Sequence, residues 1–195
     1  MWCRAMSKAV VFLAPGFEEI ETSTIVDVLR RSNVEVTLAG LEPTAIEGGH
    51  GMKFVPDKSI DEINAKDFDA AVCPGGGIGA GNLRKDNRVL TIIKEAFSAG
   101  KLVAAVCAGP VVLSDAGVLR DKRCTIFPGM ENELVKGGGK PQTDLVVEDG
   151  NVITSQGPAT ALLFSLKLAE RLAGKKAAEN VREKTLTNML LNKVC

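Results

Sequence analysis

The chain alternates short apolar runs with longer segments whose apolar residues recur at helical spacing. A short apolar run between turn residues is typical of a strand buried on both faces of a sheet. Runs of this kind predict four core strands, at residues 9–14, 34–39, 68–73 and 102–106. The Asp149-Gly150 pair predicts a hairpin of residues 145–147 and 152–154. Shorter strands are predicted at residues 52–55 and 123–127.

Helical periodicity predicts a helix at residues 17–31, in which Phe17, Ile25 and Leu29 share one face. Gly100 is expected just past the end of a second helix, because glycine readily adopts the left-handed conformation found there. The predicted helices after the first are residues 86–99, 111–116, 158–172 and 177–191, with a helical turn at residues 59–63.

This alternation of strands and helices predicts an α/β fold, an open sandwich with a mostly parallel central sheet and helices on both faces. The sequence shows no repeat, linker or low-complexity segment, so we expect a single domain of residues 1–195. Ligands of such sheets bind at the carboxyl ends of the strands. The loops that follow the strands at 9–14, 68–73 and 102–106 are therefore expected to form the site.

Cys107 is the strongest candidate for chemistry in the chain. It follows the strand at 102–106 directly and is flanked by small residues, with Pro110 opening the next helix. A thiol at such a strand-to-helix turn, a nucleophile elbow, lies near the positive end of a helix dipole, which favours the reactive thiolate. The alternative interpretation is a buried cysteine that serves only as a small apolar residue.

Glu21 is the second candidate, because it falls in the middle of the apolar face of the helix at 17–31. Glu18 lies at the flank of that face, and Glu19 is expected to point away from it. A carboxylate on an apolar stripe is expected to be protonated or paired. A protonated Glu21 can donate a hydrogen bond to the Cys107 thiolate and move a proton during turnover. The alternative is a helix carboxylate whose stem covers apolar surface.

Backbone N–H groups of Gly75, Gly76 and Ala108 are candidates to stabilise an oxyanion beside Cys107. The glycine run alone is also consistent with a bare turn, since it matches no nucleotide-binding pattern. His50, the one histidine of the chain, lies in a glycine-rich loop, where a solvated side chain is the favoured interpretation.

Composition narrows the function classes. Basic and acidic residues balance at 24 each, which gives no indication of nucleic-acid binding. No apolar run approaches the roughly 20 residues of a membrane-spanning helix, and the start shows no signal region. Five scattered cysteines indicate reduced thiols in a cytoplasmic protein, and with one histidine they predict no metal site. A serine-hydrolase elbow is absent from the sequence.

Four motifs in order resemble the ThiJ/PfpI superfamily, and within it the branch of the parkinsonism-associated deglycases and their bacterial relatives. The motifs are Ala14-Pro15-Gly16-Phe17-Glu18-Glu19-Ile20-Glu21, Pro74-Gly75-Gly76, Ala104-Ala105-Val106-Cys107-Ala108-Gly109-Pro110 and Thr154-Ser155-Gln156-Gly157-Pro158. The resemblance spans residues 9–172.

This resemblance implies a flavodoxin-like sandwich that forms a homodimer and needs no cofactor. It implies that Cys107 is the easily oxidised elbow cysteine, that Glu21 hydrogen-bonds to it, and that Gly75, Gly76 and Ala108 supply backbone donors. His50 aligns with a loop near the dimer interface, from which it is a candidate for substrate or partner contact. Some relatives carry a histidine where this chain has Phe127, so a peptidase-like Cys–His dyad is excluded at that position.

Two functions follow from the residues together with the resemblance. The first is a glutathione-independent glyoxalase or protein deglycase, in which Cys107 attacks methylglyoxal, glyoxal or an early glycation adduct and Glu21 is the acid and base. The second is a redox sensor or chaperone, in which Cys107 is oxidised to a sulfinate. An older family assignment points to thiazole monophosphate or thiamine biosynthesis.

Overall fold

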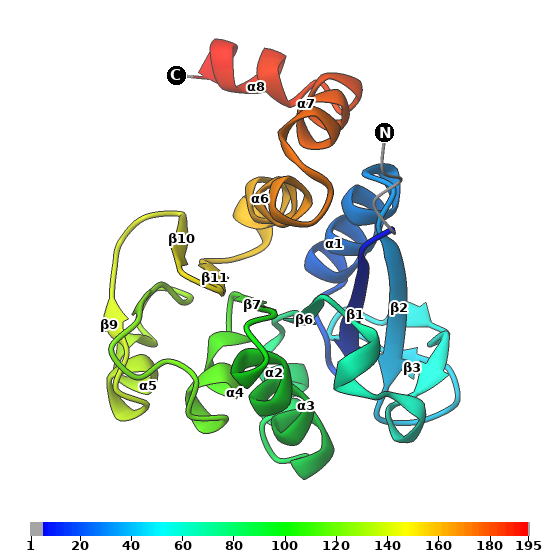
Figure 1. Ribbon diagram of the computed structural model, residues 1–195, viewed down its shortest axis with the longest axis vertical. Coiled ribbons are helices and arrows are strands. Elements are labelled where there is room, and N and C mark those ends of the chain that lie inside the picture. The colour runs from blue at the N-terminus through cyan, green and yellow to red at the C-terminus, as the bar shows by residue number, and fades with distance from the viewer. Residues whose placement is uncertain (1–5, 195) are drawn as a thin grey trace.

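The computed structural model describes residues 6–194 and places a seven-stranded sheet at the centre (Figure 1). The strand order is β10-β11-β7-β6-β1-β2-β5, and all neighbours are parallel except β10 and β11, which form the predicted hairpin. The strands of this sheet are β1 (Lys8–Leu13), β2 (Glu35–Gly40), β5 (Lys58–Ser59), β6 (Ala70–Cys73), β7 (Leu102–Val106), β10 (Val146–Asp149) and β11 (Val152–Ser155). The predicted α/β fold with a mostly parallel sheet is confirmed.

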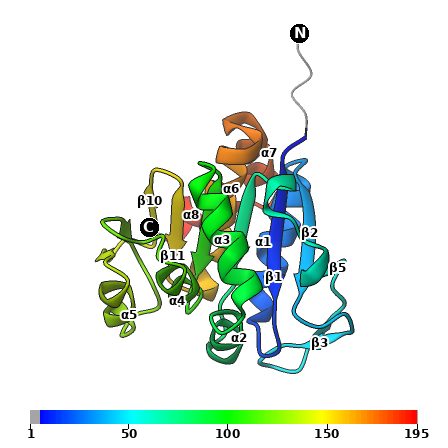
Figure 2. The same ribbon diagram turned by 60° about the horizontal axis from the view of Figure 1, so that its bottom comes forward.

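Helices cover both faces of the sheet (Figure 2). One layer contains α1 (Glu19–Arg31), α6 (Ala161–Ala173) and α7 (Lys175–Lys184), with α8 (Thr187–Val194) packed on α7. The opposite layer contains α2 (Gly77–Leu83), α3 (Asn87–Ser98) and α4 (Pro110–Asp115), with α5 (Glu131–Lys136) beside α4. Single 3₁₀ turns occur at η1 (Ile60–Glu62), η2 (Ala65–Asp67) and η3 (Pro158–Thr160).

The strands β1, β6 and β7 are apolar at every central position because each of them is covered on both faces. Val11 and Ala104 pack with the layer of α1 and α6, whereas Phe12 and Val103 pack with the layer of α3 and α4. Successive side chains of a strand point to opposite faces, so a strand inside such a sandwich has no position that faces water. Among the described helices, none is long and apolar enough to cross a lipid bilayer.

Two small sheets extend the fold at its ends. β3 (Ile46–Glu47) and β4 (Lys53–Phe54) pair antiparallel, within a segment that the sequence predicted mainly as loop. β8 (Arg123–Cys124) and β9 (Lys140–Pro141) pair in parallel. The strand predicted at residues 123–127 is therefore too long, because the Thr125 N–H donates to Thr154 Oγ1 and leaves the ladder.

Several predicted helix boundaries are wrong for identifiable reasons. α1 begins two residues later than predicted because Glu18 is its extended N-cap, which accepts from the Glu21 N–H at 2.7 Å. The predicted helix at 177–191 is two helices, since Leu186 adopts a positive φ between them. The sequence analysis missed α2, whose three glycines disfavour a helix, and the short α5. Cys3 and Cys195 lie outside the described residues.

The glycines of α2 allow this helix to approach the β1–α1 turn closely. A Cβ on Gly79 would lie 2.7 Å from the backbone N and Cα of Phe17, and the Gly79 N–H donates to the Gly16 carbonyl at 3.0 Å. A Cβ on Gly81, in the same helix, would meet no atom within 4 Å. Only one of these two glycines is therefore required by packing.

We expect Gly79→Ala to destabilise the protein by about 1–3 kcal/mol, because the added methyl group collides with backbone that has little freedom to move. Gly81→Ala is the matched control, and it should stabilise the protein by about 0.5–1 kcal/mol through helix propensity. Urea unfolding measures both values. Equal effects of the two substitutions would contradict this account of the α2 contact.

Candidate active site

Cys107 lies in a sharp turn between β7 and α4, as the sequence predicted. Its φ is +60°, a left-handed conformation that costs energy for a residue with a side chain. Two backbone hydrogen bonds hold the turn: the Cys107 N–H donates to the Ser155 carbonyl at 3.0 Å, and the Phe127 N–H donates to the Cys107 carbonyl at 2.9 Å. Strained backbone held in this way fixes the position of the thiol.

Gly75 lies against both the Cys107 thiol and the Glu21 carboxyl group. The register of the sheet pairs Cys73 with Ala105, so the residues two positions further, Gly75 and Cys107, emerge side by side. A Cβ on Gly75 would lie 2.5 Å from Cys107 Cβ, 2.5 Å from Glu21 Oε2 and 3.0 Å from Cys107 Sγ. Any larger residue would displace the thiol or the carboxyl group, so the site requires glycine here.

Glu21 is fully buried on α1 and faces this glycine. Its Oε2 accepts from the Gly75 N–H at 2.7 Å, whereas Oε1 has no hydrogen-bond partner of its own among the described groups. Burial raises the pKa of Glu21 to about 7, although the Cys107 and Gly75 hydrogen bonds oppose that rise. The carboxyl group that periodicity singled out is thus buried beside the thiol and is half-protonated near neutral pH.

The pKa of Cys107 differs from the sequence-based expectation. Burial, together with the Glu21 charge, raises the pKa of the thiol to about 12, and the N–H groups of Gly76 and Ala108 only partly offset this rise. The elbow alone therefore does not make Cys107 a thiolate. Because the charge of Glu21 opposes the charge of the thiolate, the two groups titrate as a coupled pair, and a protonated Glu21 favours ionisation of Cys107.

The three expected backbone donors have different partners. Gly76 and Ala108 direct their N–H groups to the Cys107 thiol. The Gly75 N–H donates to Glu21 Oε2, and its expected contact with an oxyanion at the sulfur stays a prediction. Gly75 acts on the thiol indirectly, because it fixes one carboxyl oxygen of Glu21.

Glu19 was expected to point away from the apolar face of α1. Its side chain is nevertheless only 4 % exposed. It binds His50 of the β3–β4 loop twice, through the backbone N–H at 2.6 Å and Nδ1 at 2.9 Å. This hydrogen bond raises the pKa of the exposed His50 imidazole. No local pattern predicts this pair, because the β3–β4 hairpin that covers Glu19 lies about thirty residues away in the chain.

Three potential metal ligands, Glu18, Glu19 and His50, have donor atoms within 4.8 Å of one another. Each carboxylate already has a structural partner, because Glu18 caps α1 and Glu19 binds His50. His50 is the one histidine in the sequence, so Cys107 is left without an imidazole partner. Phe127, whose N–H donates to the Cys107 carbonyl, offers no imidazole at its position.

Comparisons with known proteins show the family to which this chain belongs. The model of the DJ-1/PfpI family matches residues 7–171. Protein dj-1beta of Drosophila melanogaster is 42% identical, over 90% of this chain and 95% of its own. Its crystal structure superimposes with a TM-score of 0.88 at 40% identity, covering 93% of this chain and 98% of that one.

Two further relatives carry names that describe an activity. The glutathione-independent glyoxalase DJR-1.2 of Caenorhabditis elegans is 34% identical, over 98% of this chain and 97% of its own. Deglycase PH1704 of Pyrococcus horikoshii is 35% identical, over 78% of this chain and 91% of its own. With a family model that matches most of its length and relatives of this similarity, the chain belongs to the DJ-1/PfpI family.

Proposed function

We propose that this protein is a cofactor-independent glyoxalase and deglycase, with Cys107 as the nucleophile and Glu21 as the acid and base. One observation carries the proposal: a fully buried carboxyl group with a pKa of about 7 lies across a single glycine from a thiol at a strained turn. A group with this pKa is able to give and take a proton at neutral pH. The names of the worm and archaeal relatives support the same reaction class.

The reaction begins when the Cys107 thiol passes its proton to the Glu21 carboxylate, which leaves Glu21 protonated and Cys107 ionised. The sulfur attacks the aldehyde carbon of methylglyoxal, and Glu21 gives its proton to the aldehyde oxygen, which forms a hemithioacetal. The N–H groups of Gly76 and Ala108 stabilise the developing oxyanion. Glu21, now a carboxylate, takes the proton from the same carbon and yields an enediol.

Return of that proton to the neighbouring carbon gives a lactoyl thioester on Cys107. Water hydrolyses the thioester, so methylglyoxal and one water give lactate and free enzyme, and glyoxal gives glycolate. Every proton moves through Glu21 or water, and no electron acceptor is needed. Early adducts of dicarbonyls with protein amines or thiols present the same carbons, so the same attack would serve as a deglycase.

A second candidate function, a redox sensor or chaperone, has its own supporting observation. Cys107 is partly exposed, whereas the other described cysteines, Cys73 and Cys124, are buried. Two equivalents of peroxide would oxidise the Cys107 thiol to a sulfinate and form two waters. The N–H groups of Gly76 and Ala108 and a protonated Glu21 are suited to bind the sulfinate oxygens.

We also propose a homodimer and a cytoplasmic location. Two exposed apolar side chains support the dimer: Ile20 on α1 (58 % exposed) and Val55 after β4 (71 % exposed), beside a groove between these elements. The free thiols of Cys73, Cys107 and Cys124 support a reducing compartment.

Cys107→Ser should lower lactate production from methylglyoxal by at least about 100-fold, because a serine hydroxyl is a poor nucleophile without a strong base. Cys124→Ala, which removes a thiol outside the site, is the control and should retain activity. Lactate production that survives in Cys107→Ser would refute the glyoxalase. Under mild peroxide, mass spectrometry should find oxidation concentrated at Cys107, and uniform oxidation of the cysteines would refute the redox function.

Glu21→Gln should lower kcat/KM for methylglyoxal by at least about 100-fold, because the amide does not transfer protons. It should also change stability in a pH-dependent way. Burial raises the pKa of Glu21 from 4.5 to about 7, so the folded state holds this proton more tightly than the unfolded state.

The stabilisation from the Glu21 proton is complete below pH 4.5 and is lost as the pH rises through about 7. The unfolding free energy of the wild type, measured relative to Glu21→Gln, should therefore fall by about 2–3 kcal/mol from pH 5 to pH 8. Denaturant unfolding at several pH values measures it. A pH-independent difference would show that Glu21 is ionised throughout this range.

Light scattering in solution tests the dimer. The wild type should have twice the chain mass of 20.6 kDa, and Ile20→Lys combined with Val55→Lys should shift it to a monomer, because two buried charges cost more than such an interface gains. Val135→Lys, at an exposed apolar position on α5, is the control and should remain a dimer. A monomeric wild type would contradict the proposal.

A further inference from the structure

Phe127 is a large apolar residue that the mechanism above leaves unused, and its backbone is hydrogen-bonded to Cys107. We propose that Phe127 is a specificity-determining residue, which makes the Cys107 site prefer dicarbonyl compounds with an apolar, above all aryl, substituent. This inference rests on the proposed function, because it concerns the substrates that the Cys107 thiolate would attack.

The backbone places Phe127 at the edge of the thiol site. Its N–H donates to the carbonyl of Cys107 itself at 2.9 Å, while the Cys107 N–H donates to Ser155 on the other side. Gly157 follows Ser155 by two residues, and a Cβ there would lie 3.6 Å from Phe127 Cδ2. The phenyl ring therefore lies next to Gly157, two residues after the residue that accepts from the Cys107 N–H.

The ring is not buried by the rest of the chain, since Phe127 is 46 % exposed. Gly157 offers no side chain to cover it, so one part of the ring contacts backbone and another part stays open to solvent. Exposed aromatic surface beside a reactive group gains free energy when an apolar ligand covers it. A flat substituent on the carbon next to the attacked aldehyde is such a ligand.

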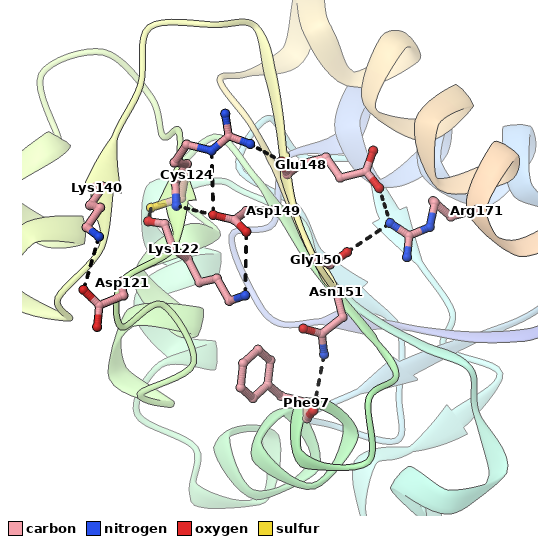
Figure 3. Close-up of polar contacts among 11 residues, drawn as sticks. Phe97, Asp121, Lys122, Cys124, Lys140, Glu148, Asp149, Gly150, Asn151 and Arg171 are labelled. Atoms are coloured by element: carbon pink, nitrogen blue, oxygen red, sulfur yellow. Dashed lines mark hydrogen bonds and ion pairs between the residues drawn. The ribbon is translucent and has the colours of Figure 1, made fainter.

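The residues just before Phe127 are held by hydrogen bonds and an ion pair, so the backbone that carries its ring is fixed in place. Figure 3 shows the Lys122 side chain paired with Asp149. The same carboxylate accepts from the Arg123 N–H at 3.0 Å. Thr125 donates through its N–H to Thr154 at 2.8 Å and through its hydroxyl to the Gln142 carbonyl at 3.0 Å. A side chain on so constrained a segment discriminates by shape better than one on a free loop.

The preference should be measurable as a ratio. Glyoxal has only hydrogen on the second carbon, methylglyoxal has a methyl group, and phenylglyoxal has an aromatic ring. Aromatic contacts of this kind change binding by roughly 3- to 10-fold. Phe127→Ala should lower kcat/KM for phenylglyoxal by that factor and leave the value for glyoxal within about 2-fold. Phe127→Leu, which retains apolar volume, should fall between the two proteins.

Val135→Ala on α5 is the control, and its ratio should equal that of the wild type. If Phe127→Ala lowers the turnover of both substrates equally, Phe127 has only a structural role and the proposal is wrong. An unchanged ratio would also overturn it.

A second measurement does not depend on turnover. Cys107 is alkylated with N-benzyl iodoacetamide or with iodoacetamide, and mass spectrometry of the Cys107 peptide gives both rates. The ratio of the two rates measures the contact between Phe127 and an aromatic group bound to the sulfur. Phe127→Ala should lower the benzyl-to-parent rate ratio by roughly 3- to 10-fold. If that ratio falls while dicarbonyls are not turned over, the proposed glyoxalase activity is refuted and the proposed apolar contact of Phe127 is supported. If the ratio is unchanged in Phe127→Ala, the proposed role of Phe127 is refuted regardless of the turnover of dicarbonyls.

Discussion

The site depends on one close contact, in which the Cys107 thiol and the Glu21 carboxyl group both lie against Gly75, where no side chain fits between them. Three parts of the fold must agree to produce it. The β6–β7 register brings Gly75 beside Cys107, the packing of α1 on the sheet buries Glu21, and the hydrogen bonds to Ser155 and Phe127 hold the strained elbow. A change in the strand register, in the packing of α1 or in the hydrogen bonds of the elbow would move the thiol and the carboxyl group apart.

The sequence predicted the two principal residues because each leaves a local signal. Cys107 ends an apolar run among small residues, and Glu21 interrupts the apolar face of a helix, where an uncompensated charge is costly. The partners of these residues depend on chain segments far apart in sequence. Neither the Gly75–Glu21 hydrogen bond nor the Glu19–His50 pair follows from periodicity, and the close approach of α2 makes a helix of a segment whose glycines predict a loop.

The environment of the pair is suited to proton transfer by a carboxyl group instead of an imidazole. An imidazole would titrate near neutral pH without help, whereas a glutamate needs burial to reach the same range. Glu21 obtains that burial from α1 and the sheet, and its pKa rises to about 7. The position beside Cys107 is then free for an apolar residue, and Phe127 makes the surroundings of the thiol suited to carbon substituents instead of to a second proton carrier.

The central claim is that Glu21 carries a proton at neutral pH, and infrared spectroscopy tests it most directly. The difference spectrum between the wild type and Glu21→Gln should show the carbonyl band of a protonated carboxyl group at pH 6. That band should disappear as the pH rises through about 7, the pKa to which burial raises this group. If the pH 6 spectrum shows only carboxylate bands, Glu21 is ionised and is not the proton donor to Cys107.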